Sequence, residues 1–167
     1  IRSHNAITFE ELQKKQNDAP KVGIKAADMK DIAEQLPILQ IGQREDIAKI
    51  ERQFFSDEHN DYDHAYGKGM LITNGTGTGK TYTGLGTIRR FLNSGKDRIL
   101  LVVPAGDVLK EWIKTARNSF GIEITQLEDR KDKGKGVVIT SIENIRDNQK
   151  IFEDTFDLVI YDECQRI

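Results

Sequence analysis

The spacing of hydrophobic residues changes partway along the chain. Up to residue 55, apolar positions at helical spacing predict helices over 26–36 and 44–55. The Thr-x-x-Glu spacing of Thr8 and Glu11 is that of a capping box and predicts a short helix that begins at Thr8. From residue 69, short apolar runs alternate with helical stretches. Strands are predicted over 69–73, 98–103, 123–127, 136–140 and 157–161, and helices over 80–93 and 107–120. Such alternation predicts an α/β fold, an open, doubly wound parallel sheet with helices on both faces.

Two segments between these elements are rich in charge. Residues 56–68 are acidic and polar, and residues 128–135 carry mostly charged side chains, so both are predicted to be solvated loops. His59 and His64 stand among aspartates in the first loop, where a metal site is conceivable. The loop interpretation is preferred because metal ligands need a fixed geometry.

Composition limits the domain count and the compartment. A chain of 167 residues, 37% of them hydrophobic, is long enough for one domain with a buried core. The net charge is only −2, so bulk charge does not indicate a nucleic-acid partner. If nucleic acid binds, a local patch or a second domain outside this chain must supply most of the phosphate contacts. A single cysteine, no secretory leader and no membrane-length apolar run favour a cytoplasmic protein without a membrane part. The ends of the chain, Ile1 and Ile167, suggest a piece of a longer protein.

A glycine-rich segment joins the strand over 69–73 to the helix that follows it. It reads Asn74, Gly75, Thr76, Gly77, Thr78, Gly79, Lys80 and Thr81. Strand, glycine-rich turn and helix form the context of a phosphate-binding loop, in which backbone N–H groups surround an anion. Lys80 is predicted to reach the β- and γ-phosphates of ATP, and the Thr81 hydroxyl to bind Mg²⁺. Asn74 replaces the glycine of the strict pattern, but asparagine tolerates left-handed backbone.

Two adjacent carboxylates end the last predicted strand. Asp162 and Glu163 follow the apolar run over 158–161, and open α/β sheets bind ligands at the carboxyl ends of their strands. Asp162 is predicted to help hold Mg²⁺, generally through water, and Glu163 to orient or deprotonate the attacking water.

These motifs, in this order, resemble the first RecA-like domain of superfamily 2 helicases and translocases, which are P-loop NTPases. Residues 74–81 resemble motif I, and residues 162–165 resemble the DEAD/DEAH-type motif II. Three further segments resemble the Snf2-like and type III restriction branches: 100–104 with 109–112, 137–144, and 39–45. In the family, a glutamine of the last segment recognises the adenine base of ATP. The resemblance therefore implies this role for Gln43. Cys164 and Gln165 depart from the usual alanine and histidine.

The resemblance implies an ATP-hydrolysing motor that depends on nucleic acid, with DNA expected before RNA. It assigns residues 39–167 to an incomplete RecA-like domain and leaves residues 1–38 as an N-terminal helical extension. A second RecA-like domain would supply arginine fingers, so the isolated chain is expected to bind ATP weakly and turn it over poorly. Glu163, Lys80 and Gln165 are the catalytic candidates.

Lys110 and Ser141 are candidate nucleic-acid contacts, with an exposed lysine and a helix cap as equally open interpretations. Two other functions also remain open at this point. A small-molecule kinase would use the same loop and Mg²⁺, although no acceptor site is recognisable. A non-catalytic nucleotide-binding module would keep Lys80 but tolerate the loss of Glu163.

Overall fold

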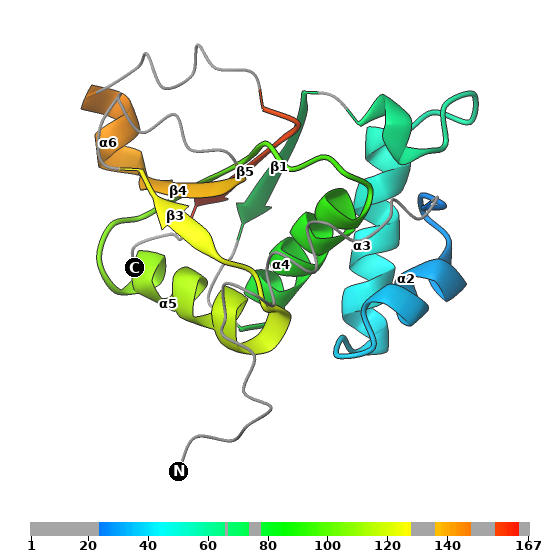
Figure 1. The fold of residues 1–167 in the computed structure, drawn as a ribbon, viewed down its shortest axis with the longest axis horizontal. Coiled ribbons are helices and arrows are strands. Elements are labelled where there is room, and N and C mark those ends of the chain that lie inside the picture. The colour runs from blue at the N-terminus through cyan, green and yellow to red at the C-terminus, as the bar shows by residue number, and fades with distance from the viewer. Residues whose placement is uncertain (1–23, 66, 74–77, 128–135, 148–155, 164–167) are drawn as a thin grey trace, which may run out of the picture.

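A five-stranded parallel sheet forms the centre of the protein (Figure 1). The computed structural model describes residues 24–65, 67–73, 78–127, 136–147 and 156–163. The strands are β1 (Lys68–Thr73), β2 (Ile99–Val103), β3 (Ile124–Gln126), β4 (Val137–Ser141) and β5 (Leu158–Glu163). Their order in the sheet is β1-β5-β2-β4-β3, and every neighbouring pair is parallel. The predicted α/β fold is therefore confirmed.

Five α-helices are described, and all but the last lie close to their predicted positions. They are α2 (Met29–Gln35), α3 (Ile41–Phe54), α4 (Thr78–Asn93), α5 (Asp107–Thr115) and α6 (Ile142–Asp147). The stretch predicted as helix over 107–120 ends in a π-helical turn, Ala116–Phe120, which Gly121 terminates in the left-handed conformation at φ 61°. Helix α6 was not predicted, because six residues are too few to show a helical period. The predicted helix that begins at Thr8 lies outside the described residues.

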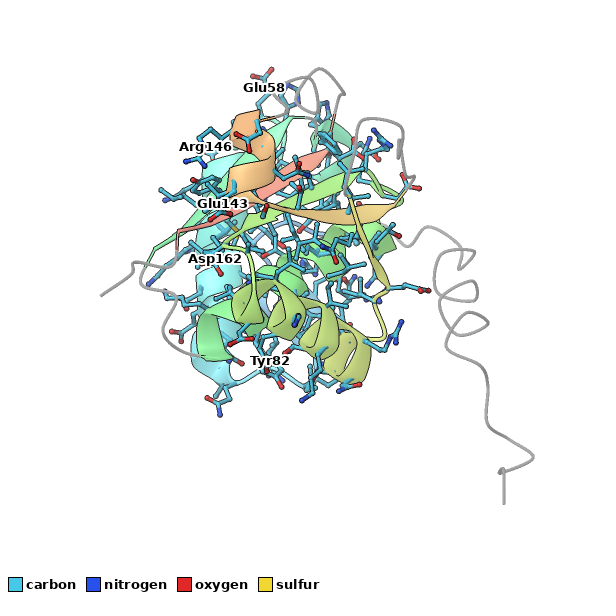
Figure 2. All side chains as sticks on the ribbon, turned by 90° about the vertical axis from the view of Figure 1, so that its left-hand side faces the viewer. Glu58, Tyr82, Glu143, Arg146 and Asp162 are labelled. Atoms are coloured by element: carbon cyan, nitrogen blue, oxygen red, sulfur yellow. The ribbon has the colours of Figure 1, made fainter. Side chains whose placement is uncertain are left out.

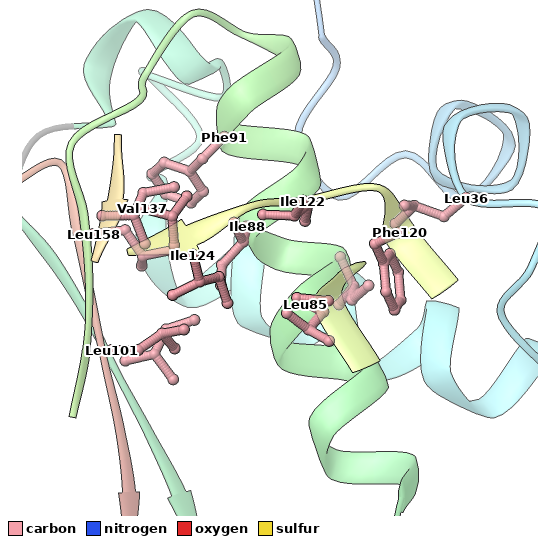
Figure 3. Close-up of a cluster of buried hydrophobic side chains, with 14 of the residues drawn as sticks. Leu36, Leu85, Ile88, Phe91, Leu101, Phe120, Ile122, Ile124, Val137 and Leu158 are labelled. Carbon is pink, nitrogen blue, oxygen red and sulfur yellow. The ribbon is translucent and has the colours of Figure 1, made fainter. Parts of the chain in front are cut away.

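Helices cover both faces of the sheet. On one face, α4 contributes Leu85, Ile88 and Phe91 to a large core that includes Leu101 and Leu158 of the strands (Figure 3). On the other face, a smaller cluster joins alternate residues of the same strands to α6. Its buried members are Leu100, Val102, Leu127, Val138, Ile145 and Phe156. The central strand β2 is fully buried on both faces, as its unbroken apolar sequence predicts.

Helix α2 belongs to the same core as the sheet. Leu36 and Leu39 lie on either side of the predicted domain boundary at residues 38 and 39. Both contact α4, since a Cβ at Gly86 would stand 3.2 Å from Leu36 and 3.0 Å from Leu39. The boundary itself stays a prediction.

The acidic segment over 56–68 is less solvated than predicted. A 3-10 turn, Tyr62–His64, buries Tyr62 against Phe55 and Phe91, and Ala65 is also buried. The prediction was wrong at Tyr62 and Ala65, because a single aromatic residue among acidic neighbours gives no sequence pattern that indicates burial. His59 and His64 stack at 4.1 Å, but the described residues contain no group of three or more potential metal ligands.

A buried ion pair connects α3 to α4. Arg90 and Glu51 are both fully buried, and Arg90 Nε donates a hydrogen bond to Glu51 Oε1. The remaining donors of Arg90 bond to Asp31, Gln35 and the Lys25 carbonyl, while Glu51 also accepts from Tyr62 and the Ala27 amide. Burial alone would lower the pKa of Arg90, but the hydrogen bond and the charge of Glu51 raise it above its usual value. Arg90 therefore stays charged inside the core.

Removing one partner of this pair is expected to destabilise the protein strongly. Arg90→Met leaves the Glu51 carboxylate buried without its counter-charge, so the free energy of unfolding should fall by about 3–5 kcal/mol. Urea denaturation followed by circular dichroism measures the change.

Arg52→Met is the matched control, because Arg52 is exposed on the same helix as Glu51. The double variant Arg90→Met/Glu51→Met should recover part of the lost stability, since it removes the uncompensated charge. Equal effects of Arg90→Met and Arg52→Met would contradict the importance of the pair.

Candidate active site

The carboxyl ends of β1 and β5 lie side by side. In the parallel register Ile72 pairs with Asp162 and Thr73 pairs with Glu163. Helix α4 begins at Thr78, so the glycine-rich segment connects the end of β1 to the start of α4. In Figure 2, Asp162 lies between α6, which carries Glu143 and Arg146, and the helical layer that contains Tyr82. The acidic pair of residues 162 and 163 thus lies beside the strand that leads into the glycine-rich segment.

The first turn of α4 presents polar groups beside α3. Lys80 is exposed and Thr81 is half-buried. Of the other predicted loop residues, Asn74, Gly75, Thr76 and Gly77 lie outside the described residues, as does Gln165. For Thr78 and Glu163 the structure describes the backbone alone.

Gln43 lies next to this turn. A Cβ at Gly79 would stand 3.8 Å from Gln43 Nε2, which places the amide against the start of α4. Gln43 Oε1 accepts a hydrogen bond of 2.9 Å from the Gln40 backbone N–H, which also explains why α3 begins earlier than predicted. The structure therefore brings Gln43 to the first turn of α4, with its side chain held by the backbone at the start of its own helix.

Asp162 is the most deeply buried of the described candidate residues, at 3% exposure. Its Oδ2 accepts a hydrogen bond of 2.9 Å from Trp112 Nε1, whereas its Oδ1 is buried and has no partner among the described residues. Burial raises the pKa of the Asp162 carboxyl above its usual value, although the Trp112 hydrogen bond opposes that change. A buried carboxylate oxygen that no described residue contacts by a hydrogen bond fits a place in the hydration shell of Mg²⁺.

Trp112 contacts this site although the sequence did not mark it as a site residue. It occurs in a segment that resembles a helicase motif, but its size and its apolar neighbours there indicated only a core position. No periodic signal connects residues 112 and 162, so the contact had to come from the fold.

The two candidate nucleic-acid contacts differ in their surroundings. Lys110 is exposed on α5. Ser141 Oγ accepts a hydrogen bond of 3.0 Å from the Asn144 backbone N–H and so caps the start of α6. For Ser141 the structure favours the helix-cap interpretation, and for Lys110 it leaves the side chain accessible.

A protein-family model described as type III restriction enzyme, res subunit, matches residues 36–167. The chain belongs to this family. Type III res subunits are DExx-box helicases of superfamily 2, so the family resemblance and the RecA-like assignment of the sheet are confirmed. No curated protein matches the chain.

Membership of the res-subunit family identifies a helicase-type ATPase motor domain. It implies a nucleotide, a nucleic-acid substrate and a second domain. In the described parts of the chain, no helix is both long and apolar enough to cross a membrane.

The raised pKa of Asp162 predicts a pH-dependent stability effect. A carboxyl whose pKa is higher in the folded state stabilises the fold below its unfolded pKa, and this contribution is lost as the pH rises through the folded pKa. Asp162→Asn keeps an acceptor for Trp112 and removes the buried charge. The variant should therefore be more stable than the natural protein at pH 7, with a difference that disappears toward pH 4.

Urea midpoints measured from pH 4 to pH 8 in EDTA test this prediction. Asp97→Asn serves as control, because Asp97 is exposed between α4 and β2 and its replacement should leave the midpoint unchanged. An Asp162→Asn variant that is less stable at pH 7 would show that the carboxylate is not penalised by burial.

Proposed function

We propose that this chain binds ATP with Mg²⁺ at the edge formed by β1, β5 and α4, and that it hydrolyses ATP to drive movement along DNA. The observation that carries the proposal is the register of β1 with β5, which sets Asp162 and Glu163 beside the strand that leads into the glycine-rich segment. Phosphate-binding loop and acidic pair are the two halves of a nucleotide-hydrolysing site.

Each group has a distinct role in this proposal. The backbone N–H groups of residues 75–80 and the start of α4 hold the phosphates, and Lys80 adds a positive charge that can reach them. Thr81 and Asp162 hold Mg²⁺, which supplies charge neutralisation at the β- and γ-phosphates when bound. Glu163 orients the attacking water and accepts its proton.

DNA is the proposed track because the family is named for restriction enzymes, whose substrate is DNA. The accessible Lys110 on α5 is a candidate phosphate contact, as the sequence predicted. A second RecA-like domain is proposed to complete the site with arginine side chains, and Gln165 to link the acidic motif to nucleic acid.

The ATPase reaction of the full-length protein tests the proposal. Phosphate release should rise strongly when double-stranded DNA is added, and Glu163→Gln should lower kcat by about 10²–10⁴-fold while ATP still binds, since only the general base is lost. Lys80→Ala should abolish ATP binding in an equilibrium assay.

Glu34→Gln and Lys30→Ala are matched controls, because both side chains are exposed on α2, which carries no candidate site residue. If only single-stranded DNA or only RNA stimulates ATP hydrolysis, that nucleic acid takes the place of duplex DNA in the proposal. Phosphate transfer to a metabolite without any nucleic-acid effect would favour the kinase, and full activity of Glu163→Gln would contradict the catalytic assignment.

Gln43 is expected to recognise the adenine base. Gln43→Ala removes the amide beside Gly79, so KM for ATP should rise about 10-fold, the worth of one or two hydrogen bonds, with kcat almost unchanged. The preference for ATP over GTP should fall by a similar factor.

Gln43→Glu separates base recognition from helix capping. It keeps the oxygen that accepts from Gln40 and loses the amide N–H donors, so α3 remains capped while adenine recognition is lost. Gln53→Ala, at an exposed position near the end of α3, is the control. An unchanged ATP-to-GTP ratio in both Gln43 variants would refute the assignment.

A further inference from the structure

Trp112 reaches the acidic end of β5 from the inside of helix α5. Its side chain is 1% exposed and lies on the core face of α5 with Leu109, while Lys110 and Glu111 face outward. From this face Trp112 Nε1 donates a hydrogen bond of 2.9 Å to Asp162 Oδ2. An indole has one N–H donor and no acceptor, so this bond uses the whole polar capacity of the side chain.

The indole ring is held in place by the helix that follows the phosphate-binding loop. A Cβ at Gly84 of α4 would stand 2.7 Å from Trp112 Cη2 and 3.3 Å from Cζ3. The ring therefore occupies space that any other residue at position 84 would need. Trp112 is enclosed between α4 and β5, so its N–H direction is fixed by packing as well as by the hydrogen bond.

This arrangement leaves the two oxygens of Asp162 in different states. Oδ2 is bound to Trp112, whereas Oδ1 is buried and has no partner among the described residues. A carboxylate fixed by one oxygen cannot rotate without breaking that bond. The acceptor available to an incoming hydrated cation is thus a single oxygen, already oriented before the cation binds.

We propose that Trp112 is a positioning residue of the ATP site, whose indole N–H fixes Asp162 so that Oδ1 accepts from the Mg²⁺ hydration shell. The proposal rests on the proposed function, because it gives Asp162 a metal to bind. Partners that orient metal ligands in this way commonly change metal affinity by 10–100-fold when they are removed. A tryptophan that served only to fill the core would affect stability and leave the metal requirement unchanged.

Trp112→Phe tests the role of the N–H group. The variant keeps an aromatic ring between α4 and β5 and removes the donor. The Mg²⁺ concentration that gives half-maximal ATPase activity of the full-length protein should rise at least 10-fold, while nucleotide affinity measured in EDTA stays within 2-fold of the natural protein. Phe91→Leu is the control, because Phe91 is equally buried in the same core and should change stability without changing the Mg²⁺ requirement.

Gly84→Ala approaches the same bond from α4. The added methyl group must displace the indole ring, so this variant should also raise the Mg²⁺ requirement although it alters no polar group. Gly42→Ala is its control, since nothing lies within 4 Å of a Cβ at Gly42.

The indole N–H resonance gives a readout that does not depend on ATP hydrolysis. In protein labelled with ¹⁵N at the indole, the Trp112 proton signal is assigned by its absence from Trp112→Phe. Asp162→Asn should move this signal upfield, because a neutral acceptor forms a weaker hydrogen bond than a carboxylate, and Asp97→Asn should not move it.

These outcomes separate the two proposals. A natural protein without Mg²⁺-dependent ATP binding overturns the proposed function and the positioning role together. If ATP binding depends on Mg²⁺ but Trp112→Phe keeps the natural Mg²⁺ requirement, the positioning role alone is overturned. An indole signal that does not move in Asp162→Asn also overturns the positioning role. If Trp112→Phe loses nucleotide affinity equally in EDTA and in Mg²⁺, Trp112 has a packing role only.

Discussion

The buried ion pair between Arg90 and Glu51 is the constraint on which the candidate site depends most. It joins α4, whose first turn carries Lys80, to α3, whose first turn carries Gln43. Both helices run from the candidate site toward this pair, so it sets their relative position from the opposite end. The candidate side chains at the start of each helix are thereby placed by the protein core, and rigid elements hold a site more accurately than loops do.

Parallel pairing of β1 with β5 supplies the second constraint, and it has a cost. The register brings Asp162 beside the strand that leads into the glycine-rich segment, but the carboxyl there is buried, and this burial raises its pKa. A core residue at this position would be apolar. The Asp162 carboxylate is instead a charge whose burial is unfavourable for stability. Active sites show this kind of local conflict between stability and function.

The elements of this fold could be predicted from the sequence because each one has its own local signal. Unbroken Ile, Leu and Val marked β2, and glycines between a strand and a helix marked the candidate site. The contacts that connect the elements could not be predicted in the same way. Arg90 and Glu51 are 39 residues apart, and Trp112 and Asp162 are 50 apart. A lone buried charge or indole has no periodicity, so its partner appears only when the chain is folded.

Gly84 shows that the candidate site extends beyond the segments recognisable as motifs. The glycines of residues 75–79 have a reason that the sequence displays, because the predicted phosphate-binding loop needs a close approach of backbone to a phosphate. Gly84 lies within the interior of α4, where glycine normally weakens a helix by roughly 1 kcal/mol relative to alanine, and nothing in the sequence explains it. The explanation is the Trp112 ring, which fills the position of the missing side chain on its way to Asp162. The position of the Asp162 carboxylate therefore depends on a glycine of α4, through the Trp112 side chain of α5.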